Sequence, residues 1–319
     1  MRQFQVLGFI LLLQGCVTVQ QQKPVKIPAV DNEFTIMTFN TKWLMGDESQ
    51  VERLKKKGIW GLGDKDEESE IALQHQSVAT LIVRHLPDIL CLQEVINEVA
   101  AKRLQKTLGV KGIGYDLHFL NSRDTFLEQD VAFMTRKGNG KISNIELSHP
   151  KDPYNPSKCL ILKCEVDGER TAFIGLHLKS VPTKTSSVEK REKQADSVIR
   201  ELNALKPLGY SPVVIGDIND WDPIIPDSDG APKATPTSTV LKRLKDYEQG
   251  GDNELINSLK WVEPLEQRYT YDYKGSRTVL DHILLPKTWK KKIIHATIDH
   301  DRPEGASDHW PLIVKLRRN

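Results

Sequence analysis

The stretch Ser307-Asp308-His309-Trp310-Pro311-Leu312 carries an acid and an imidazole to the start of an apolar run near the end of the chain. Five other apolar runs also deliver polar side chains. They are Phe34–Asn40, Ile89–Glu94, Phe173–Leu178, Val213–Asn219 and Asp281–Leu285. Short apolar runs of this kind predict buried β-strands. Because each strand delivers a carboxylate, an amide or an imidazole, we expect these groups to form one site at one edge of a sheet.

Six short motifs follow one another through these runs. They are Thr38-Phe39-Asn40, Leu92-Gln93-Glu94-Val95, Gly175-Leu176-His177, Gly216-Asp217-Ile218-Asn219, Leu280-Asp281-His282 and Ser307-Asp308-His309. Each motif alone is common, but together and in this order they resemble the endonuclease/exonuclease/phosphatase superfamily, the metal-dependent phosphodiesterases that include deoxyribonuclease I. The resemblance implies a four-layer α/β sandwich, in which two packed, mostly antiparallel β-sheets are flanked by helices. It also places a catalytic cleft at one edge of the two sheets.

The composition is that of an ordinary globular protein without a dominant charge. Hydrophobic residues make up 39% of the 319 residues and charged residues 28%, and 45 basic and 43 acidic residues leave a net charge of +2. This balance excludes the strong basic field that drives nucleic-acid scanning. Contacts with a polyanion must therefore come from local patches. For the two lysine triplets, Lys55–Lys57 and Lys290–Lys292, a solvated surface is the favoured interpretation.

The first 33 residues are predicted to lie outside the fold. Arg2 precedes an apolar run, Val6–Leu13, that is too short to span a bilayer and is typical of a signal peptide. Leu13-Gln14-Gly15-Cys16 resembles the lipobox of bacterial lipoproteins, although Gln14 stands where a small residue is usual. We therefore expect a signal peptide over residues 1–15, a lipidated tether over 16–33 and a catalytic domain over 34–319. The expected location is the cell envelope, with the protein anchored through Cys16 to the bacterial outer membrane or cell surface, and plain secretion is the alternative.

Residue patterns between the motifs predict alternating strands and helices. Helices are expected over residues 70–85, 97–108 and 186–205, the last of which begins at a capping-box pattern, Ser186-Ser187-Val188-Glu189. In the second helix, Val99, Leu104 and Leu108 should share the buried side. Gly138-Asn139-Gly140 is typical of a β-hairpin turn. Residues 222–238, which are rich in Pro and Asp, predict a loop.

A phosphodiester resists hydrolysis because its negative charge repels nucleophiles, so a hard cation and a base for water are needed. Glu94, directly after an apolar strand, is the best candidate for a direct ligand of Mg²⁺ or Mn²⁺. Asn40 also ends a strand, and it is expected to offer its amide oxygen to the metal or its amide nitrogen to the phosphate. Asp308 is expected to face the metal.

The remaining site residues have catalytic roles that the family resemblance implies. Asp217 and Asn219 face the same way if the chain is extended, and should contact the scissile phosphate and the metal. His309 is the expected general base, with its imidazole oriented by Asp281. His177 should stabilise the phosphate or protonate the leaving oxygen. Its expected partner is Glu128, Gln129 or Asp130, and the sequence does not choose among them.

Three functions remain open at this stage. The favoured one is a nuclease, expected to be monomeric, that cuts DNA or RNA. Its backbone contacts would come from basic residues near the motifs, namely Lys42, Lys179, Arg268, Lys274 and Arg277. The second is a lipid-directed phosphodiesterase or phosphatase of the sphingomyelinase kind, but no aromatic-apolar hairpin suited to bilayer insertion is evident. The third, a non-catalytic binding protein, would require a broken motif, and all six are intact.

Overall fold

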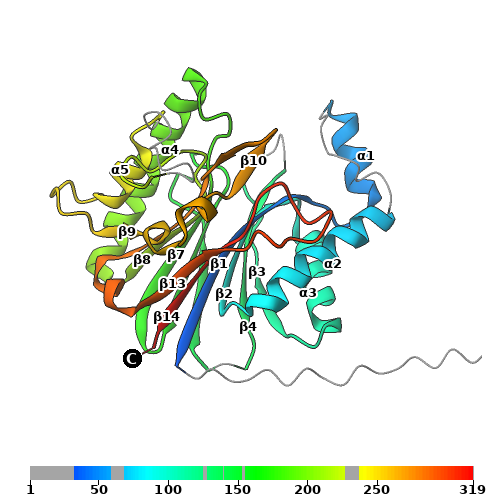
Figure 1. Cartoon of the computed structure of the whole chain (residues 1–319), viewed down its shortest axis with the longest axis horizontal. Helices are drawn as coiled ribbons and strands as arrows, with labels where there is room; N and C mark the ends of the chain where they lie inside the picture. The colour runs from blue at the N-terminus through cyan, green and yellow to red at the C-terminus, as the bar shows by residue number, and fades with distance from the viewer. Residues whose placement is uncertain are drawn as a thin grey trace, which may run out of the picture.

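Two six-stranded β-sheets pack face to face in the computed structural model, which describes residues 32–58, 68–124, 128–138, 140–152, 155–226 and 237–318 (Figure 1). The first sheet has the strand order β13-β14-β1-β2-β4-β3. Its strands are β1 (Glu33–Leu44), β2 (Ile89–Val95), β3 (Tyr115–His118), β4 (Asp130–Arg136), β13 (Ile293–Ile298) and β14 (Leu312–Arg317). The second sheet has the order β5-β6-β7-β8-β12-β9. Its strands are β5 (Ile142–Ser148), β6 (Cys159–Val166), β7 (Glu169–His177), β8 (Ser211–Asp217), β9 (Leu255–Asn257) and β12 (Asp281–Pro286).

Helices cover the outer face of each sheet. The first sheet carries α2 (Glu68–His85) and α3 (Glu98–Val110), and the second carries α4 (Thr185–Leu205) and α5 (Val240–Lys245). Short 3₁₀ segments span Lys206–Leu208, Ser258–Trp261, Leu265–Gln267 and Lys287–Lys292. Pairing is antiparallel except for the β1–β2 and β7–β8 pairs. The predicted four-layer α/β sandwich with mostly antiparallel sheets is therefore confirmed.

Alternation along the strands builds three apolar layers. In β2, Ile89 and Cys91 face the opposite sheet, whereas Leu90 and Leu92 face α2 and α3. Successive side chains of a strand point to opposite faces, so a sheet covered on both faces is apolar at every position. The burial of both faces explains why the strands read as unbroken apolar runs in the sequence.

Several local predictions need correction. The expected hairpin at Gly138 is wrong, because β4 pairs with β2 and β3 whereas β5 pairs with β6. The chain therefore crosses from the first sheet to the second between β4 and β5. Helix α4 begins one residue before the expected capping box, and its N-cap residue Lys184 makes no side-chain capping bond. In α3, Leu104 and Leu108 are buried as expected, but Val99 is 53% exposed.

Two elements that the sequence reading did not predict stand at the same end of the sandwich (Figure 1). Helix α1 (Glu48–Lys56) is strongly amphipathic, and buries Val51 and Leu54. Strands β10 (Tyr271–Tyr273) and β11 (Ser276–Thr278) form a hairpin. Lys274 and Gly275 at its turn both have positive φ, of 52° and 85°, which matches a two-residue turn that follows the strand twist.

No helix in the described ranges has the length and apolar character needed to cross a membrane. The predicted signal peptide and nearly all of the predicted tether lie outside the described residues, which begin at Asn32.

Candidate active site

Three site residues lie side by side because of the register of the second sheet. His177 at the end of β7 is the register partner of Asp217 at the end of β8, and Asp217 is in turn the partner of Asp281 at the start of β12. All three side chains are buried. An imidazole and two carboxylates that are far apart in the sequence are thus placed on adjacent strands at one edge.

Gly216 allows this arrangement of strands. Its φ is +134°, and a Cβ atom there would lie 2.1 Å from the carbonyl oxygen of Leu176 on the neighbouring strand. Any larger residue would push β7 and β8 apart just before His177 and Asp217. The glycine in the Gly216-Asp217-Ile218-Asn219 motif therefore has a steric function.

Asn40 joins the two sheets at the site. Its Nδ2 donates to Glu94 Oε1 at 3.2 Å and to Asp217 Oδ2 at 3.0 Å, and its Oδ1 accepts from the backbone N–H of Lys42 at 3.0 Å. Only this orientation of the amide satisfies all three partners, because two are acceptors and one is a donor. The structure therefore directs the nitrogen of Asn40, and not its oxygen, into the site.

Glu94 comes from the neighbouring strand of the first sheet. It has a positive φ of 60°, which takes the chain out of the regular strand at this residue. Its Oε2 accepts from the backbone N–H of Trp43 at 3.1 Å, and its side chain is 16% exposed. Glu94 is thus held by two hydrogen bonds and keeps part of its carboxylate accessible.

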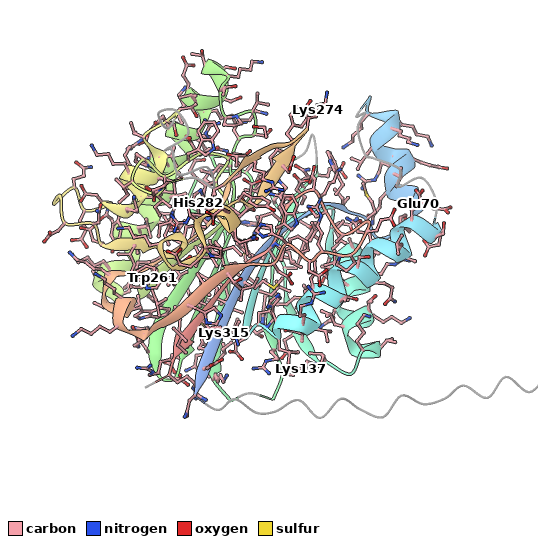
Figure 2. The ribbon with its side chains drawn as sticks, in the orientation of Figure 1. Glu70, Lys137, Trp261, Lys274, His282 and Lys315 are labelled. Carbon is pink, nitrogen blue, oxygen red and sulfur yellow. The ribbon has the colours of Figure 1, made fainter. Side chains whose placement is uncertain are left out.

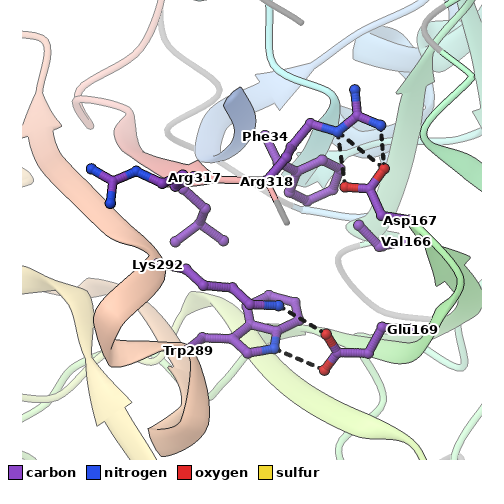
Figure 3. Close-up of a pocket in the computed structure, with 9 residues that line it drawn as sticks. Phe34, Val166, Asp167, Glu169, Trp289, Lys292, Arg317 and Arg318 are labelled. Carbon is purple, nitrogen blue, oxygen red and sulfur yellow. Dashed lines mark hydrogen bonds and ion pairs between the residues drawn. The ribbon is translucent and has the colours of Figure 1, made fainter. Parts of the chain in front are cut away.

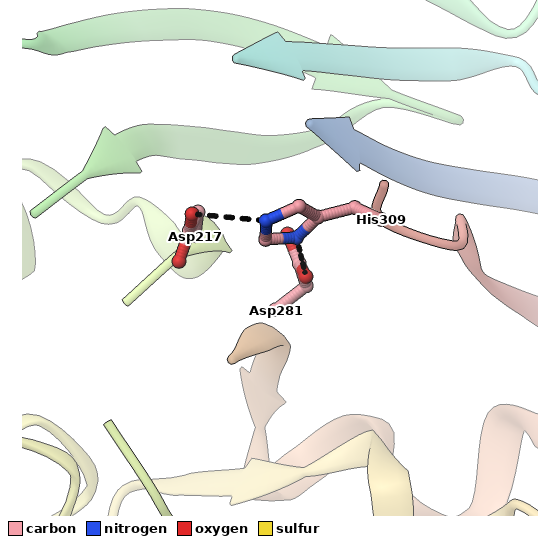
Figure 4. Close-up of side chains that lie close together, drawn as sticks. All are labelled: Asp217, Asp281 and His309. Carbon is pink, nitrogen blue, oxygen red and sulfur yellow. Dashed lines mark hydrogen bonds and ion pairs between the residues drawn. The ribbon is translucent and has the colours of Figure 1, made fainter. Parts of the chain in front are cut away.

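His309 and Asp281 form the expected pair (Figure 4). Nδ1 of His309 lies 2.7 Å from Asp281 Oδ2, which leaves Nε2 directed toward Asp217 Oδ2 at 4.0 Å. Ser307 fixes the approach of this segment, since its hydroxyl donates to Asn40 O at 2.7 Å and accepts from His309 N at 3.0 Å. The ring of Tyr271 packs against the imidazole, with centroids 4.8 Å apart. Ser307 opens the Ser307-Asp308-His309 motif, but the sequence alone predicted no separate role for it.

The site carries an excess of buried negative charge. Burial, together with the charges of Asp281 and Glu94, raises the pKa of Asp217 to about 7, against the opposing effects of His309 and Asn40. Burial alone would lower the pKa of His309, but Asp281, Asp217 and Asp308 together raise it to about 10. Both shifts indicate a site that attracts positive charge.

The residues present fit a hard divalent cation. Ligand atoms of Asp217, Asp281 and His309 all lie within 4.8 Å of one another. Oδ1 of Asp281 is buried without a hydrogen-bond partner among the described residues. Glu94 Oε1 and Asp217 Oδ2 both lie 3.8 Å from His177 Nε2, so the Glu94 carboxylate adjoins this cluster. A group of mainly carboxylate oxygens is typical of Mg²⁺ or Mn²⁺ sites.

Asp308 and Asn219 lie at the margins of this cluster. Asp308 is 3.5 Å from Lys42 Nζ, and both side chains are about one-third exposed, at 35% and 38%. Asn219 has a positive φ of 56°, donates its backbone N–H to Asp217 Oδ1 at 2.9 Å, and donates Nδ2 to Leu178 O at 3.2 Å. Asn219 therefore braces Asp217 and the chain that follows His177.

Of the two site histidines, His177 makes fewer side-chain hydrogen bonds. Burial, then the charges of Lys158, His309 and Lys179, lower its pKa well below the ordinary range, so it is neutral. Its Nδ1 is buried without a hydrogen-bond partner in the part of the chain described.

None of the three residues proposed as a partner for His177 hydrogen bonds to it in the structure. Glu128 pairs with Arg53 and Lys57, Gln129 accepts from Lys158, and Asp130 accepts from Ser122 N at 2.7 Å. Burial raises the pKa of Asp130 to about 6. Gln129 reaches His177 only indirectly, because the carbonyl of Lys158 accepts the His177 backbone N–H.

His282 belongs to the Leu280-Asp281-His282 motif, but its ring contacts residues outside the site. Its Nε2 lies 2.9 Å from Asp220 O and its Nδ1 lies 3.0 Å from Asn257 Nδ2. Asp220 is also buried, and its carboxylate lies 3.5 Å from Nη2 of Arg191 on α4. This network fixes the loop that follows Asp217.

A shallow hollow that is open to solvent lies at the opposite end of the sandwich, and Figure 3 shows the residues that line it. Its charged groups pair with one another, Arg318 with Asp167 and Lys292 with Glu169, and Trp289 donates to Glu169 at 2.9 Å. It lies near the beginnings of β1 and β7, whereas the site residues lie near their ends. The hollow is therefore separate from the site.

A model of the Endonuclease/Exonuclease/phosphatase family matches residues 37–309, which include every motif residue from Thr38 to His309. The chain belongs to the endonuclease/exonuclease/phosphatase family. None of the curated protein sequences gives a significant match.

Solved structures with the same fold have low sequence identity to this chain. One is the endonuclease/exonuclease/phosphatase from Bacteroides vulgatus, with 17% identity, a TM-score of 0.60, and coverage of 90% of this chain and 100% of that one. A variant of the 3′ phosphatase NExo from Neisseria, bound to a product DNA hairpin, has 17% identity, a TM-score of 0.58, and coverage of 89% and 99%. Truncated TDP2 from Caenorhabditis elegans has 14% identity, a TM-score of 0.57, and coverage of 90% and 98%.

Membership places the chain among hydrolases that act on phosphate esters and depend on divalent metals. Its candidate metal ligands lie among the clustered Asp217, Asp281 and His309 and the Glu94 carboxylate that adjoins them.

Proposed function

We propose that this protein is a metal-dependent phosphodiesterase that cleaves nucleic acid, with residues 34–319 as its catalytic domain. The observation that carries the proposal is the convergence of Asn40 and Glu94 from one sheet with His177, Asp217 and Asp281 from the other. Folding alone does not require this convergence, because it buries several carboxylates with little compensating positive charge.

Glu94 and Asp217 are proposed to hold Mg²⁺ or Mn²⁺, with Asp308 nearby at the rim. A bound cation would neutralise the scissile phosphate and assist departure of the leaving oxygen. Asn40 keeps its two carboxylate partners in place through the hydrogen bonds of its amide nitrogen. Asn219 holds Asp217 from the opposite side.

His309 is proposed to take the proton from the attacking water at Nε2. Its Nδ1 faces Asp281, which fixes the tautomer that leaves Nε2 as the acceptor and stabilises the imidazolium that results. The neutral His177 is proposed to donate Nε2–H to a phosphate oxygen as the P–O bond breaks, a role that suits its lowered pKa. Positive charge near the carboxylates lowers the pKa of His309, so occupation of the metal site and the basicity of this residue are linked.

The surroundings of the site favour nucleic acid over a lipid. The β10–β11 hairpin beside the site carries a single strongly exposed aromatic residue, Tyr273, at 59%, with Lys274 over its ring at 5.3 Å (Figure 2). A tip with this basic and aromatic character suits a base and its phosphate, whereas insertion into a bilayer requires a larger apolar tip. The 3′ phosphatase with the same fold binds a DNA hairpin.

We also propose that Cys16 is lipidated and anchors the protein in the bacterial cell envelope as a monomer. The support is the sequence Leu13-Gln14-Gly15-Cys16 after a short apolar run. Glu33, the first residue of β1, lies at the end of that strand remote from Asn40. A tether joined there would enter the domain at the end of the sandwich remote from the catalytic edge.

The test is hydrolysis of a panel of duplex DNA, single-stranded DNA, RNA and sphingomyelin by the purified protein. We expect a nucleic acid to be cleaved with Mg²⁺ or Mn²⁺ and protected by EDTA. Glu94→Gln should abolish the activity without loss of folding. Cleavage of sphingomyelin alone would refute the nuclease proposal, and activity that survives thorough chelation would refute the metal requirement.

A further inference from the structure

Four lysines gather on one side of His177, at the α4 flank of the site. Lys158 directly precedes β6, and its carbonyl accepts the backbone N–H of His177 at 3.0 Å. Lys179 follows His177 by two residues. Lys184 is the N-cap of α4, and Lys190 lies in its second turn. The N-terminal part of α4 reaches the same end of the sandwich as the β10 hairpin (Figure 1).

The backbone of Lys179 is fixed from beneath by α4. Its N–H donates to Gln194 Oε1 at 2.9 Å, and its carbonyl accepts from Arg191 Nη1 at 3.0 Å. Both side chains from α4 are buried, Arg191 at 0% exposure. Arg191 also donates to Pro182 O at 2.8 Å, so the whole segment after His177 is held in one position. The backbone that carries the Lys179 ammonium group is thus held in a fixed position.

The positive charge at this flank is only partly neutralised. The pKa of Lys179 is lowered, first by burial and then by repulsion from Lys158, Lys190 and Lys184, with Asp124 opposing. Lys158 contacts Gln129 and lies 3.4 Å from Asp124. Glu192 on α4 adds little compensation, because it already pairs with Arg243 at 2.9 Å. Mutual repulsion among lysines is relieved when an anion binds between them.

The other basic residues near the motifs are engaged with the protein itself. Arg268 is buried and donates to the carbonyls of Pro226 and Val262. The guanidinium of Arg277 stacks over Tyr269 at 4.5 Å. Lys179, Lys184 and Lys190 at the α4 flank are therefore better placed for substrate phosphates than these two arginines, whereas Lys158 already pairs with Asp124.

We propose that Lys179, with Lys184 and Lys190 beyond it, binds a backbone phosphate next to the scissile one, so that the substrate is a polynucleotide lying along the α4 flank. This inference rests on the proposed function and locates the surface along which the nucleic acid would lie. A lysine ammonium is a strong point-charge ligand for phosphate. Sphingomyelin has one phosphate and a quaternary ammonium, which this cluster would repel. A polynucleotide carries further phosphates on either side of the bond that is cut.

The test compares affinity for a fluorescein-labelled 12-nucleotide DNA, as a single strand and as a duplex, with hydrolysis of bis-p-nitrophenyl phosphate, which has no neighbouring phosphate. Affinity is measured by fluorescence anisotropy in EDTA, where cleavage stops. Lys179→Gln and Lys190→Gln should each weaken DNA binding about fivefold, the effect of one partly exposed ion pair. The slope of log affinity against log salt should fall by about 1 per lysine. Lys179→Arg should restore binding, and Lys106→Gln on α3 is the matched control.

The loss of DNA affinity should exceed any loss in bis-p-nitrophenyl phosphate hydrolysis with metal present. Unchanged DNA affinity in the Lys179 and Lys190 variants, or a wild-type protein that does not bind the DNA, would overturn the inference. Equal losses on both substrates would also overturn it, because the lysines would then act on the reacting phosphate. A wild-type protein that binds DNA through these lysines but never cleaves nucleic acid with Mg²⁺ or Mn²⁺ would instead refute the proposed nuclease function.

Discussion

The His309–Asp281 pair permits a quantitative test of the catalytic proposal. Both side chains are buried, and the 2.7 Å contact joins an imidazole to a carboxylate. General-base catalysis contributes roughly 10²- to 10⁴-fold in rate, so His309→Ala should lower kcat by that factor. A hydrogen bond to a charged group contributes about 1.5–3 kcal/mol, so Asp281→Asn should cost roughly 10- to 150-fold. The double variant should be about as slow as His309→Ala, because the two residues act as one unit.

The assay is steady-state hydrolysis of bis-p-nitrophenyl phosphate with saturating Mn²⁺ by the wild type and the three variants. Thermal melting of each protein controls for misfolding. If the loss in the double variant equals the product of the two single losses, Asp281 and His309 act independently and the pair must be abandoned. Titration of His309 by NMR in the metal-free protein provides a second readout. Its pKa of about 10 should fall in Asp281→Asn, since Asp281 is the largest cause that raises it.

Three further outcomes follow from the structure. Mg²⁺ or Mn²⁺ should raise the melting temperature more at pH 8 than at pH 6. The reason is that the pKa of Asp217 is raised to about 7, so bound metal must displace the Asp217 proton at the lower pH. Equal shifts at the two pH values would show that Asp217 is not a metal ligand. Gly216→Ala should lose activity and roughly 1–3 kcal/mol of stability, since its Cβ would lie 2.1 Å from Leu176 O; an unimpaired variant in chemical denaturation and kinetic assays would contradict the close approach of β7 and β8. The wild-type protein should fractionate with membranes and Cys16→Ser should not, when both are exported; identical fractionation would refute lipidation.

Stability of the metal-free protein should also depend on His309. Its folded pKa of about 10 lies above the ordinary value of 6.5, so its interactions stabilise the fold fully below pH 6.5 and are lost as the pH rises through 10. Chemical denaturation across this range should show a loss in the wild type that is absent in His309→Ala. A pH-independent difference between the two proteins would contradict the raised pKa.

The sequence predicted the layers and the site motifs because both depend on strong local signals. Apolar runs such as Ile89–Leu92 predict buried strands, and the polar residue at the end of each run marks the edge of the sheet. The register that makes His177, Asp217 and Asp281 neighbours is a tertiary property, so the sequence indicated a shared edge but not their order across it.

The elements that escaped prediction have weak local signals. Helix α1 lies in a polar stretch, and its two buried apolar residues, Val51 and Leu54, are too few to reveal its amphipathic character. Strands β10 and β11 are three residues each, shorter than a periodic pattern can mark. The misread turn at Gly138 has the residues of a hairpin, but nothing local tells a hairpin from a crossover between sheets.

Asn40 hydrogen bonds to Glu94 in its own sheet and to Asp217 in the other, so the catalytic constellation exists only while the two sheets keep their spacing. That spacing is set in the shared core, where Gly175 faces Phe133 so closely that a Cβ would meet its ring at 2.8 Å. Slight thickening of the shared core, as in Gly175→Ala, should separate Asn40 from Asp217 before it unfolds the chain. The catalytic rate would then report the spacing between the two sheets. It would fall as the spacing increases, while both sheets are still folded.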